Sequence, residues 1–383
     1  MDGRAPASGT LTRPTTPIRR ATALFSHHLR VLWLLVAFAF GLGSAAHAAE
    51  LQQVHYGFGD KAVSPVLINL LVPQYLGYYQ QEGLTVDFVP LGANAAVLAA
   101  LDSKRIEFGT GVAAFQLPKL AVGDRMPSVN VFEYIYPFKF AMAVNQDSPV
   151  KTFADLKGKR IGVSHFGNAE YAIARHLLQQ VHVDPDKDVK WLAVGEGVNS
   201  AIALQRGDID SLMYYDTAFG LIEAAGFKLR YLPLPPNFPR IGGTFISVRK
   251  DILADHRAWA VGFARAVLKG ETFILQNPRA AAYIFLKMYP EAAPRNMTLD
   301  QQINAILALI TKHIALFRPY DASMKWGYIR PADWQDEIDF YNVKGIKDGA
   351  KSLFTNELID EINNFNRDEI VKQAKTFKIP TSQ

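Results

Sequence analysis

Short β-rich runs alternate with helical stretches between residues 54 and 248. Runs such as 85–90 and 161–163 are brief and rich in β-branched or aromatic residues, whereas stretches such as 169–180 are long enough to form a helix. This alternation is typical of α/β proteins, because a crossover helix carries the chain back to begin the next parallel strand. The sequence therefore predicts an α/β fold with parallel sheets.

The same order of strands and helices runs twice, which predicts two lobes. The first set covers residues 54–121, with strands expected at 54–58, 85–90 and 106–109 and helices at 93–101 and 112–121. One further helix is expected from Ser64-Pro65 to about Gln81, with Ser64 as its cap. The second set begins after a turn that ends at Pro149, with strands expected at 161–163, 190–194 and 209–213 and helices at 169–180 and 198–205. The repeat is one of architecture, since the residues themselves do not recur as they do in a solenoid.

The lobes are expected to be joined by strands rather than by a flexible linker. Two apolar runs, 140–144 and 244–248, contain no turn residue and are predicted to be the crossover strands. From Ile252 onward apolar residues recur every three or four positions, which predicts a helical C-terminal region that packs on the first lobe. The predicted organisation is lobe one at 49–142, lobe two at 143–244, and the return to lobe one with C-terminal helices at 245–383.

Residues 1–48 are predicted to be a cleaved signal peptide. Basic residues precede the apolar run 31–43, and the small-residue sequence Ala46-His47-Ala48 follows it. A membrane anchor is the alternative, but the run is short against the roughly 20 residues that cross a bilayer. A paired arginine lacks the bulky apolar residue of a twin-arginine signal, so the general secretion route is expected. We therefore expect a periplasmic protein, cleaved near Ala48.

The charge and the cysteine content exclude several classes of protein. The leader holds five of the 41 Lys and Arg residues and one of the 36 acidic residues, so the mature chain has a net charge of +1. A near-neutral chain lacks the excess of positive charge that attracts nucleic acid. The absence of cysteine excludes disulfides, thiol catalysis and thiolate metal sites. We expect a monomer that binds no nucleic acid, metal or cofactor.

Several turn and strand motifs follow one another in a recognisable order. They include Asp-Leu-Lys-Gly-Lys-Arg-Ile-Gly-Val at 155–163 and Ala-Leu-Gln-Arg-Gly-Asp-Ile-Asp at 203–210, with further segments at 78–86, 99–109, 191–195 and 354–359. Together they resemble type II periplasmic binding proteins, in particular the branch that binds sulfonates, nitrate, taurine and thiamine-pyrimidine precursors. The resemblance implies a two-lobe fold and the solute-binding component of an ABC importer, with a membrane permease as partner.

The candidate binding residues follow the predicted strands. In open α/β sheets a ligand binds beyond the carboxyl ends of the strands, where helix N-termini present free N–H groups. Two facing lobes would bring two such edges to one cleft, with amides, hydroxyls and rings but few full charges. The expected residues are Phe58, Asp60, Lys61, Gly92, Asn94, Thr110, Gly111 and Val112 from lobe one, and Ser164, His165, Phe166, Gly167, Asn168, Glu196, Asn199, Tyr214, Tyr215 and Asp216 from lobe two.

Several of these residues also suit a purely structural role. Asn94 and Thr110 could cap helices, and Asp60 with Lys61 could form a surface ion pair of little energetic value. A lone loop histidine such as His165 is commonly exposed without any function. These alternatives stay open from the sequence alone.

Two groups of aromatic residues are expected near the cleft. Tyr214 and Tyr215 are neighbours at a strand end and should face opposite ways, so at least one of them should reach the cleft. The even-numbered aromatics from 134 to 140 should share one face and lie mostly in the core, with one in contact with the ligand.

We expect the protein to trap its ligand by closure, with hinges at 141–144 and 244–248. The expected cleft lacks an arginine clamp, which favours an aromatic or heteroaromatic solute; an organic anion is the other ligand class that the resemblance implies. The alternative is an enzyme on the same fold, related to thiamine-pyrimidine or menaquinone-pathway enzymes. The sequence contains no Ser-His-Asp order and no His-x-x-x-His pair that would support it. A sensor or interaction module is a further alternative.

Overall fold

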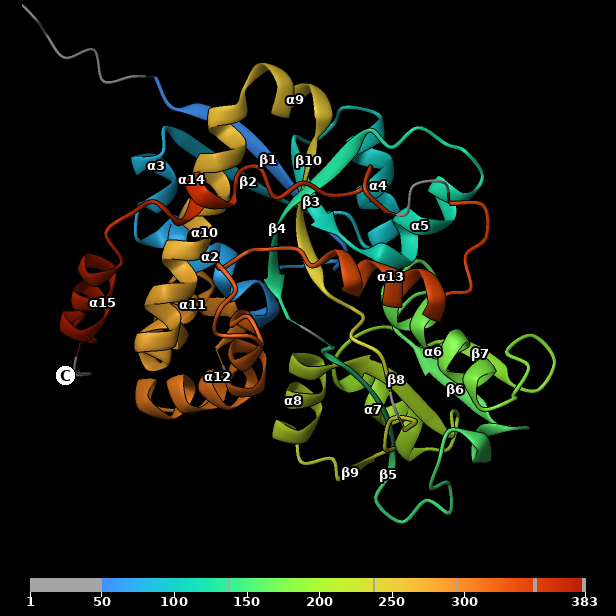
Figure 1. The fold of residues 1–383 in the computed structure, drawn as a ribbon. Helices are drawn as coiled ribbons and strands as arrows, with labels where there is room; N and C mark the ends of the chain where they lie inside the picture. Colours follow the sequence, from blue (N-terminus) through green and yellow to red (C-terminus); the bar gives the residue numbers. More distant parts are fainter. Residues whose placement is uncertain (1–49, 137, 237, 294, 347–349, 381–383) are drawn as a thin grey trace, which may run out of the picture. The chain divides into compact units, whose positions relative to one another are not determined.

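Two five-stranded sheets form the framework of the protein (Figure 1). The computed structural model describes residues 50–136, 138–236, 238–293, 295–346 and 350–380, so the predicted signal peptide lies outside the described residues. The first sheet has the order β2 (Leu84–Pro90), β1 (Gln52–Phe58), β3 (Phe108–Gly111), β10 (Thr244–Arg249) and β4 (Ser128–Ile135). The second sheet has the order β7 (Lys190–Ala193), β6 (Arg160–Val163), β8 (Ser211–Tyr215), β5 (Phe140–Asn145) and β9 (Leu229–Tyr231).

The two sheets share one topology. β1 pairs in parallel with β2 and β3, and β6 pairs in parallel with β7 and β8. The next strand in each sheet, β10 or β5, runs antiparallel and arrives from the other sheet. The predicted α/β fold is confirmed, but the prediction of purely parallel sheets is wrong. A strand that enters from the facing lobe starts at the carboxyl edge of the sheet and must run in the opposite direction.

The chain passes between the sheets twice, once between β4 and β5 and once between β9 and β10. β5 lies wholly in the second sheet and β10 wholly in the first, so the chain crosses beside these strands rather than within them. The expected lobe boundaries at 142 and 244 fall inside β5 and β10. Strand pairing places Met142 in the second sheet and Thr244 in the first.

The alternating pattern locates most helices to within a residue or two. α4 (Asn94–Asp102), α5 (Ala113–Ala121), α6 (Ala169–Gln180) and α7 (Val198–Gln205) lie where the pattern predicts them. The third strand of each set, however, begins and ends later than predicted. As a result Thr110 and Tyr215 belong to β3 and β8 themselves rather than to the loops that follow.

The single helix predicted after Ser64 is wrong, because the chain forms three short helices there. They are η1 (Pro65–Leu67), α2 (Ile68–Tyr75) and α3 (Tyr78–Gln81). Gly77 has a φ of 75°, a left-handed conformation that ends the helical path between α2 and α3. Ser64 precedes η1 as predicted, but its side chain makes no capping hydrogen bond.

The C-terminal region is mainly helical, as predicted. It contains α9 (Lys250–Asp255), α10 (Arg257–Gln276), α11 (Pro278–Met288), η3 (Pro290–Ala292), α12 (Leu299–Ile314), η4 (Ala315–Phe317), α13 (Pro331–Phe340), α14 (Ile359–Asn363) and α15 (Arg367–Thr376). α10 packs against α2 and α3, whereas α12 packs against α8 (Asp216–Ala224), which follows β8 (Figure 1). The C-terminal helices therefore contact both lobes rather than the first alone. Within the described ranges, no helix is both long and apolar enough to cross a membrane.

An aromatic stack anchors α10 to the first sheet. Phe263 of α10 stacks on Phe108 of β3 with ring centroids 4.5 Å apart, and on Tyr56 of β1 with centroids 5.4 Å apart. All three rings are buried. Each such side chain contributes roughly 1.5–3 kcal/mol by leaving water, so this stack holds the strands that end at the cleft in a rigid arrangement.

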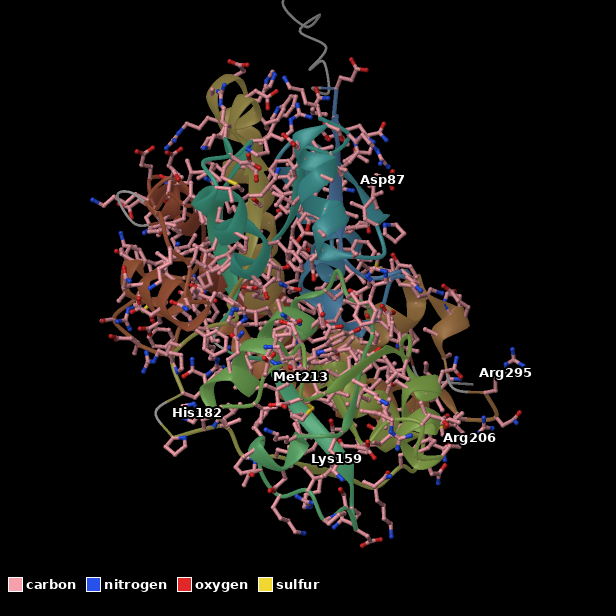
Figure 2. The ribbon with its side chains drawn as sticks, turned by 90° about the vertical axis from the view of Figure 1, so that its right-hand side faces the viewer. Asp87, Lys159, His182, Arg206, Met213 and Arg295 are labelled. Atoms are coloured by element: carbon pink, nitrogen blue, oxygen red, sulfur yellow. The ribbon has the colours of Figure 1, made fainter. Side chains whose placement is uncertain are left out.

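The second sheet has an apolar core that extends toward the first lobe. Met213 of β8 clusters with Ile173 and Leu177 of α6, and the same cluster continues to Leu117 of α5. Figure 2 shows Met213 inside the lobe, among the side chains around its strands. Apolar contact between α5 and α6 therefore joins the two lobes beside the cleft.

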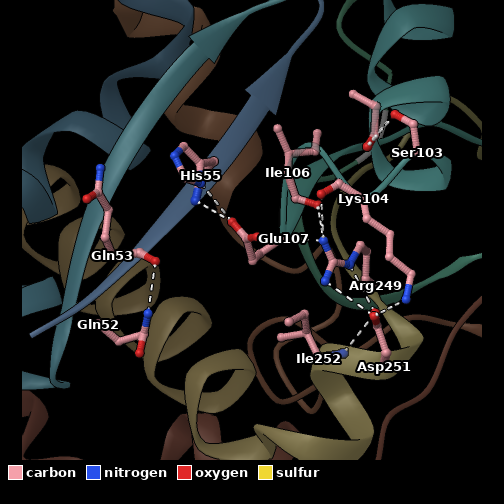
Figure 3. Close-up of polar contacts among 11 residues, drawn as sticks. Gln52, Gln53, His55, Ser103, Lys104, Ile106, Glu107, Arg249, Asp251 and Ile252 are labelled. Atoms are coloured by element: carbon pink, nitrogen blue, oxygen red, sulfur yellow. Dashed lines mark hydrogen bonds and ion pairs between the residues drawn. The ribbon is translucent and has the colours of Figure 1, made fainter.

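A polar network closes the amino-terminal end of β3 (Figure 3). Glu107 accepts a hydrogen bond from the backbone N–H of His55 at 2.8 Å and lies 3.6 Å from the guanidinium of Arg249. Asp251 accepts from Arg249 Nε at 3.0 Å and pairs with Lys104 at 3.0 Å. The network ties β1, β3 and β10 together at the end of β3 away from the candidate binding residues.

Glu271 of α10 is a fully buried acid with an incomplete set of hydrogen bonds. Its Oε1 accepts from Asn69 Nδ2 of α2 at 3.3 Å, while its Oε2 and Asn69 Oδ1 have no partner among the described residues. Burial raises the pKa of Glu271 well above its ordinary value, although the Asn69 hydrogen bond opposes the shift. Keeping this carboxyl ionised inside the core therefore costs stability.

We expect Glu271→Gln to stabilise the protein by roughly 1 kcal/mol at neutral pH, because the amide keeps the acceptor and can donate to Asn69 Oδ1. With a raised folded-state pKa, the wild type is most stable below the unfolded-state pKa and loses stability as the pH rises toward the folded-state pKa. The gain measured by urea unfolding should therefore grow as the pH rises above the unfolded-state pKa of about 4.3. The exposed Glu357→Gln is the control, and a gain independent of pH would contradict the expectation.

Candidate functional site

A cavity lies between the two sheets at the carboxyl ends of their strands. Its volume is about 50 Å³, which is room for a few water molecules and far below the roughly 300 Å³ or more of a typical ligand pocket. Both lobes contribute side chains to it, together with α12. It is lined by Phe58, Gly59, Asp60, Val66, Leu67, Asn94, Thr110, Tyr134, Ile135, Lys139, Phe140, Asn168, Glu170, Tyr215 and His313.

The structure brings six of the eighteen predicted binding residues together on this cavity. Tyr215 faces it, whereas the hydroxyl of Tyr214 points to the loop before α7 and lies 3.3 Å from the carbonyl oxygen of Gly195. Neighbouring residues of a strand face opposite ways, which is the reason for this division. The six that line the cavity are Phe58, Asp60, Asn94, Thr110, Asn168 and Tyr215.

Three further predicted residues lie just behind the cavity wall. Ser164 hydrogen-bonds to Glu170, and Asp216 hydrogen-bonds to His313. Gly111 allows close packing, because a Cβ at this position would collide with the side chain of Asn130. Ser164 and Asp216 therefore hold residues that line the cavity, and Gly111 makes room for a neighbouring side chain, but none of the three lines the cavity itself.

The remaining predicted residues are placed away from the cavity wall. Nδ1 of His165 accepts a hydrogen bond from its own loop, from Gly167 N–H at 2.9 Å. Phe166 is 48% exposed and rests against the ring of Tyr171. Lys61 and Asn199 are exposed, and Glu196 is partly buried. Burial, followed by the charge of Asp60, raises the pKa of Glu196.

Sequence reasoning missed three ionisable residues of the cavity. Glu170 is the second residue of α6, two positions after Asn168, and its place next to a predicted cleft residue was a usable signal. Lys139 lies between β4 and β5, where the alternating aromatics had drawn attention. His313 comes from α12, nearly a hundred residues beyond β8, and no local pattern points to it.

Two carboxyl groups face the cavity. The pKa of Asp60 is raised by burial, and the charge of Lys139 and the Tyr215 hydroxyl oppose the shift. Burial raises the pKa of Glu170 to about 7, although the hydroxyl of Ser164 partly stabilises its anion. Near neutral pH, Glu170 therefore exists in both protonation states, and the charge of the cavity changes with pH.

The start of α4 is capped by the opposite lobe. The backbone N–H of Asn94 donates to Asn168 Oδ1 at 3.1 Å, and the N–H of Ala95 donates to the carbonyl oxygen of Gly167 at 3.3 Å. Asn168 is the N-cap residue of α6, yet its side chain does not cap its own helix. The free N–H groups that we expected a ligand to use are thus partly occupied by lobe two, which holds the lobes together.

The amide of Asn168 also connects this latch to the acid in the cavity. Its Nδ2 donates to Ser164 Oγ at 2.9 Å, which leaves the Ser164 hydroxyl to donate to Glu170 Oε1. A single chain of hydrogen bonds therefore runs from Glu170 to the first turn of α4. A change in the charge or the contacts of Glu170 would therefore alter the hydrogen bonds that join the lobes.

His313 forms a second polar link between the lobes. Its Nδ1 lies 3.0 Å from Asp216 Oδ2 at the start of α8, and its Nε2 lies 3.1 Å from the carbonyl oxygen of Val66 in η1. Burial alone would raise the pKa of Asp216, but the charge and hydrogen bond of His313 hold it below its ordinary value. Since both ring nitrogens face acceptors, the imidazolium form satisfies both contacts.

A hydroxyl chain supports the lobe-one wall. The phenol of Tyr56 lies 3.1 Å from Thr110 Oγ1 and 3.1 Å from the phenol of Tyr134. Burial raises the pKa of Tyr56 to about 12, so the phenol stays protonated. Thr110 and Tyr134 both line the cavity, and the chain fixes where their hydroxyls point. A guest would find an ordered set of hydroxyls on this side.

Two facing α/β lobes with a polar cavity at their carboxyl edges define the periplasmic binding protein fold. Residues 64–281, more than half of the chain, match the model of the family described as NMT1/THI5 like, and the chain belongs to this family. The predicted resemblance to type II periplasmic binding proteins is confirmed.

Solved structures show the same fold at low sequence identity. The alkanesulfonate-binding protein SsuA from Xanthomonas axonopodis pv. citri, bound to MOPS, has a TM-score of 0.58 at 16% identity, over 82% of this chain and 98% of that chain. The ligand-binding component of an ABC-type import system from Staphylococcus aureus has a TM-score of 0.56 at 14% identity, over 81% of this chain and 99% of that chain. Likeness at such identities establishes the fold alone.

A curated relative is similar over most of the chain. The riboflavin-binding protein RibY of Chloroflexus aurantiacus is 22% identical over 291 residues, which cover 74% of this chain and 79% of RibY. The relatives therefore include binding proteins for different solutes.

We expect Asn168→Ala to shift the lobes toward an open arrangement. The change removes the acceptor for Asn94 N–H, and one such hydrogen bond is worth roughly 1 kcal/mol, or about a fivefold change in the ratio of closed to open molecules. Small-angle scattering should show a larger radius of gyration. Asn199→Ala, at an exposed position of α7, is the matched control. An unchanged radius of gyration in Asn168→Ala would show that the latch contributes little.

We expect Asp216→Asn to destabilise the protein by roughly 3 kcal/mol, because it removes one partner of a buried pair and leaves the imidazole of His313 without its carboxylate. The lowered pKa of Asp216 means that its contribution is present above the unfolded-state pKa of about 3.9 and is lost as the pH falls through the folded-state pKa. The deficit of the variant should thus shrink below about pH 4 in denaturant titrations. Asp300→Asn, in an exposed ion pair, is the control. A deficit that stays constant at acidic pH would refute this assignment.

Proposed function

We propose that this protein is the solute-binding component of an ABC-type importer. It captures a small organic molecule between its lobes and presents it to a membrane permease. The family, the fold and the similarity to an import-system component from Staphylococcus aureus support this role. The observation that carries the proposal is the polar cavity, which is lined from both lobes at the carboxyl ends of their strands.

The small volume of the cavity is consistent with a closed state. Its walls are held together by the Asn168 and His313 contacts and by apolar packing of α5 on α6. A guest enters when the lobes separate about the two chain passages between the sheets, and it makes contacts to both lobes after closure. Closure is favoured only to the extent that the guest binds the closed form more tightly than the open form.

The proposed contacts combine residues predicted from the sequence with residues found in the fold. Rings flank the cavity on both sides, hydroxyls line one wall, and acids and a lysine supply charge. This set suits a compact aromatic or heteroaromatic solute. The proposed contact residues are Phe58, Asp60, Asn94, Thr110, Tyr134, Phe140, Asn168, Glu170 and Tyr215.

The cellular setting is part of the proposal. Cleavage near Ala48 would release the mature chain into the periplasm, where it would act as a monomer whose lobes are divided near residues 142 and 244. The basic segment and apolar run of the leader support export. An enzyme and an importer component can be distinguished by what happens to the bound molecule, because an importer component releases it chemically unchanged.

We expect the mature protein to retain one small molecule from a cell extract, visible as a discrete mass increment in native mass spectrometry. After the guest is removed by mild unfolding and the protein is refolded, adding it back should reduce the radius of gyration in small-angle scattering, because the guest favours the closed lobes. The guest should be recovered with its mass unchanged.

The matched variants are Asp60→Asn in the cavity and Asp147→Asn at an exposed turn. The first should lose retention and compaction, and the second should keep both. If wild-type protein retained no guest and showed no compaction with any extract fraction, the solute-binding role would be wrong. A chemically converted guest would favour the enzyme.

A further inference from the structure

Lys139 places an ammonium group inside a ring-lined part of the cavity. It lies in the passage between β4 and β5, and its Nζ is 5.6 Å from the ring centroid of Phe140 and 5.8 Å from that of Tyr215. Both distances are within the range in which a cation is attracted to an aromatic face. The side chain is partly buried and lines the cavity.

The ammonium of Lys139 has no close anionic partner. Among the described residues it makes no ion pair within 4.0 Å, although its charge lowers the pKa values of Asp60, Glu170 and Asp216. It is therefore held by the two rings and by longer-range attraction to carboxyl groups. Because the four-carbon side chain is flexible, its ammonium can leave this position over the rings at a low cost in free energy.

The balance of charge around the cavity favours another cation over an anion. Asp216 is paired with His313, whose two ring nitrogens contact that carboxylate and the carbonyl oxygen of Val66. Asp60 and Glu170 remain, and among the described residues that line the cavity Lys139 is the one basic side chain besides His313. An anionic guest would face both carboxyls in a partly desolvated space, whereas a cationic guest would be attracted to them.

We propose that the natural guest is an organic cation, and that Lys139 occupies the place of its charged group while the cavity is empty. This inference rests on the proposed solute-binding function. On binding, the positive group of the guest lies over Phe140 and Tyr215 beside Asp60 and Glu170, and the Lys139 side chain moves out toward solvent. Lys139 thereby sets the affinity, because every guest must displace it.

Protonation of Glu170 adds a second expectation. Its pKa of about 7 means that the carboxyl gains charge as the pH rises through neutrality. A cation should therefore bind more tightly at about pH 8 than at about pH 6, and a neutral ring compound should show no such change. Glu170→Gln should reduce this pH dependence, while Asp60, whose pKa is also raised by burial, remains ionisable.

The test uses three ring compounds that differ in charge: benzylammonium, benzyl alcohol and benzoate. Titration calorimetry would measure their affinities for the mature wild-type protein, for Lys139→Gln and Lys139→Met, and for Lys190→Gln, at an exposed position of β7. We expect wild type to prefer benzylammonium, and both Lys139 variants to bind it roughly tenfold more tightly, since the competing cation over the rings is gone. Lys190→Gln should match wild type.

Several results would overturn the inference. They are a preference of wild type for benzoate that is lost in the Lys139 variants, equal affinity for the three probes, and binding of none of them. The first would make Lys139 an anchor for anions instead. None of these results bears on whether the protein retains a natural guest and compacts around it, so the proposed function is judged separately by native mass spectrometry and scattering.

Discussion

Hydrogen bonding of β10 between β3 and β4 is the constraint on which the rest of the structure depends. It returns the chain from the second sheet to a place beside the strand from which it left. The two passages between the sheets therefore start from neighbouring strands of the first sheet. This arrangement attaches the second lobe to one edge of the first sheet and turns the carboxyl ends of both sheets toward one another. The carboxyl ends of the strands are where α/β proteins bind ligands.

The contacts across the cavity differ in kind from those inside the first lobe. Buried rings such as Phe263 and Phe108 fix the strands of that lobe, whereas the cavity walls meet through single polar contacts such as Asn94 with Asn168 and His313 with Asp216. A neutral contact such as that of Asn94 with Asn168 contributes about 1 kcal/mol net and is readily exchanged for a contact with water or ligand. A rigid frame with exchangeable contacts between its halves suits reversible closure.

Much of the fold follows from local patterns, and the misjudged elements have identifiable causes. The helices α6 and α7 were located by their flanking turn residues, because helix ends have strong local signals. The β3 and β8 strands were placed too early, since a short apolar run does not mark where strand pairing stops. This shift matters for Thr110 and Tyr215, which belong to strands and not to loops. The helix expected to span Gly77 is broken there by a left-handed backbone conformation.

By itself the sequence determined the α/β class, the two repeated sets of strands and helices, and the strand ends that carry Asp60, Asn168 and Tyr215, because these features depend on residues close together in the chain. Only the tertiary structure decided that Lys139 and His313 belong to the same cavity, and that Asn168 caps a helix of the opposite lobe. Such contacts join segments far apart in sequence, and their geometry depends on how the two sheets pack, which no local pattern encodes.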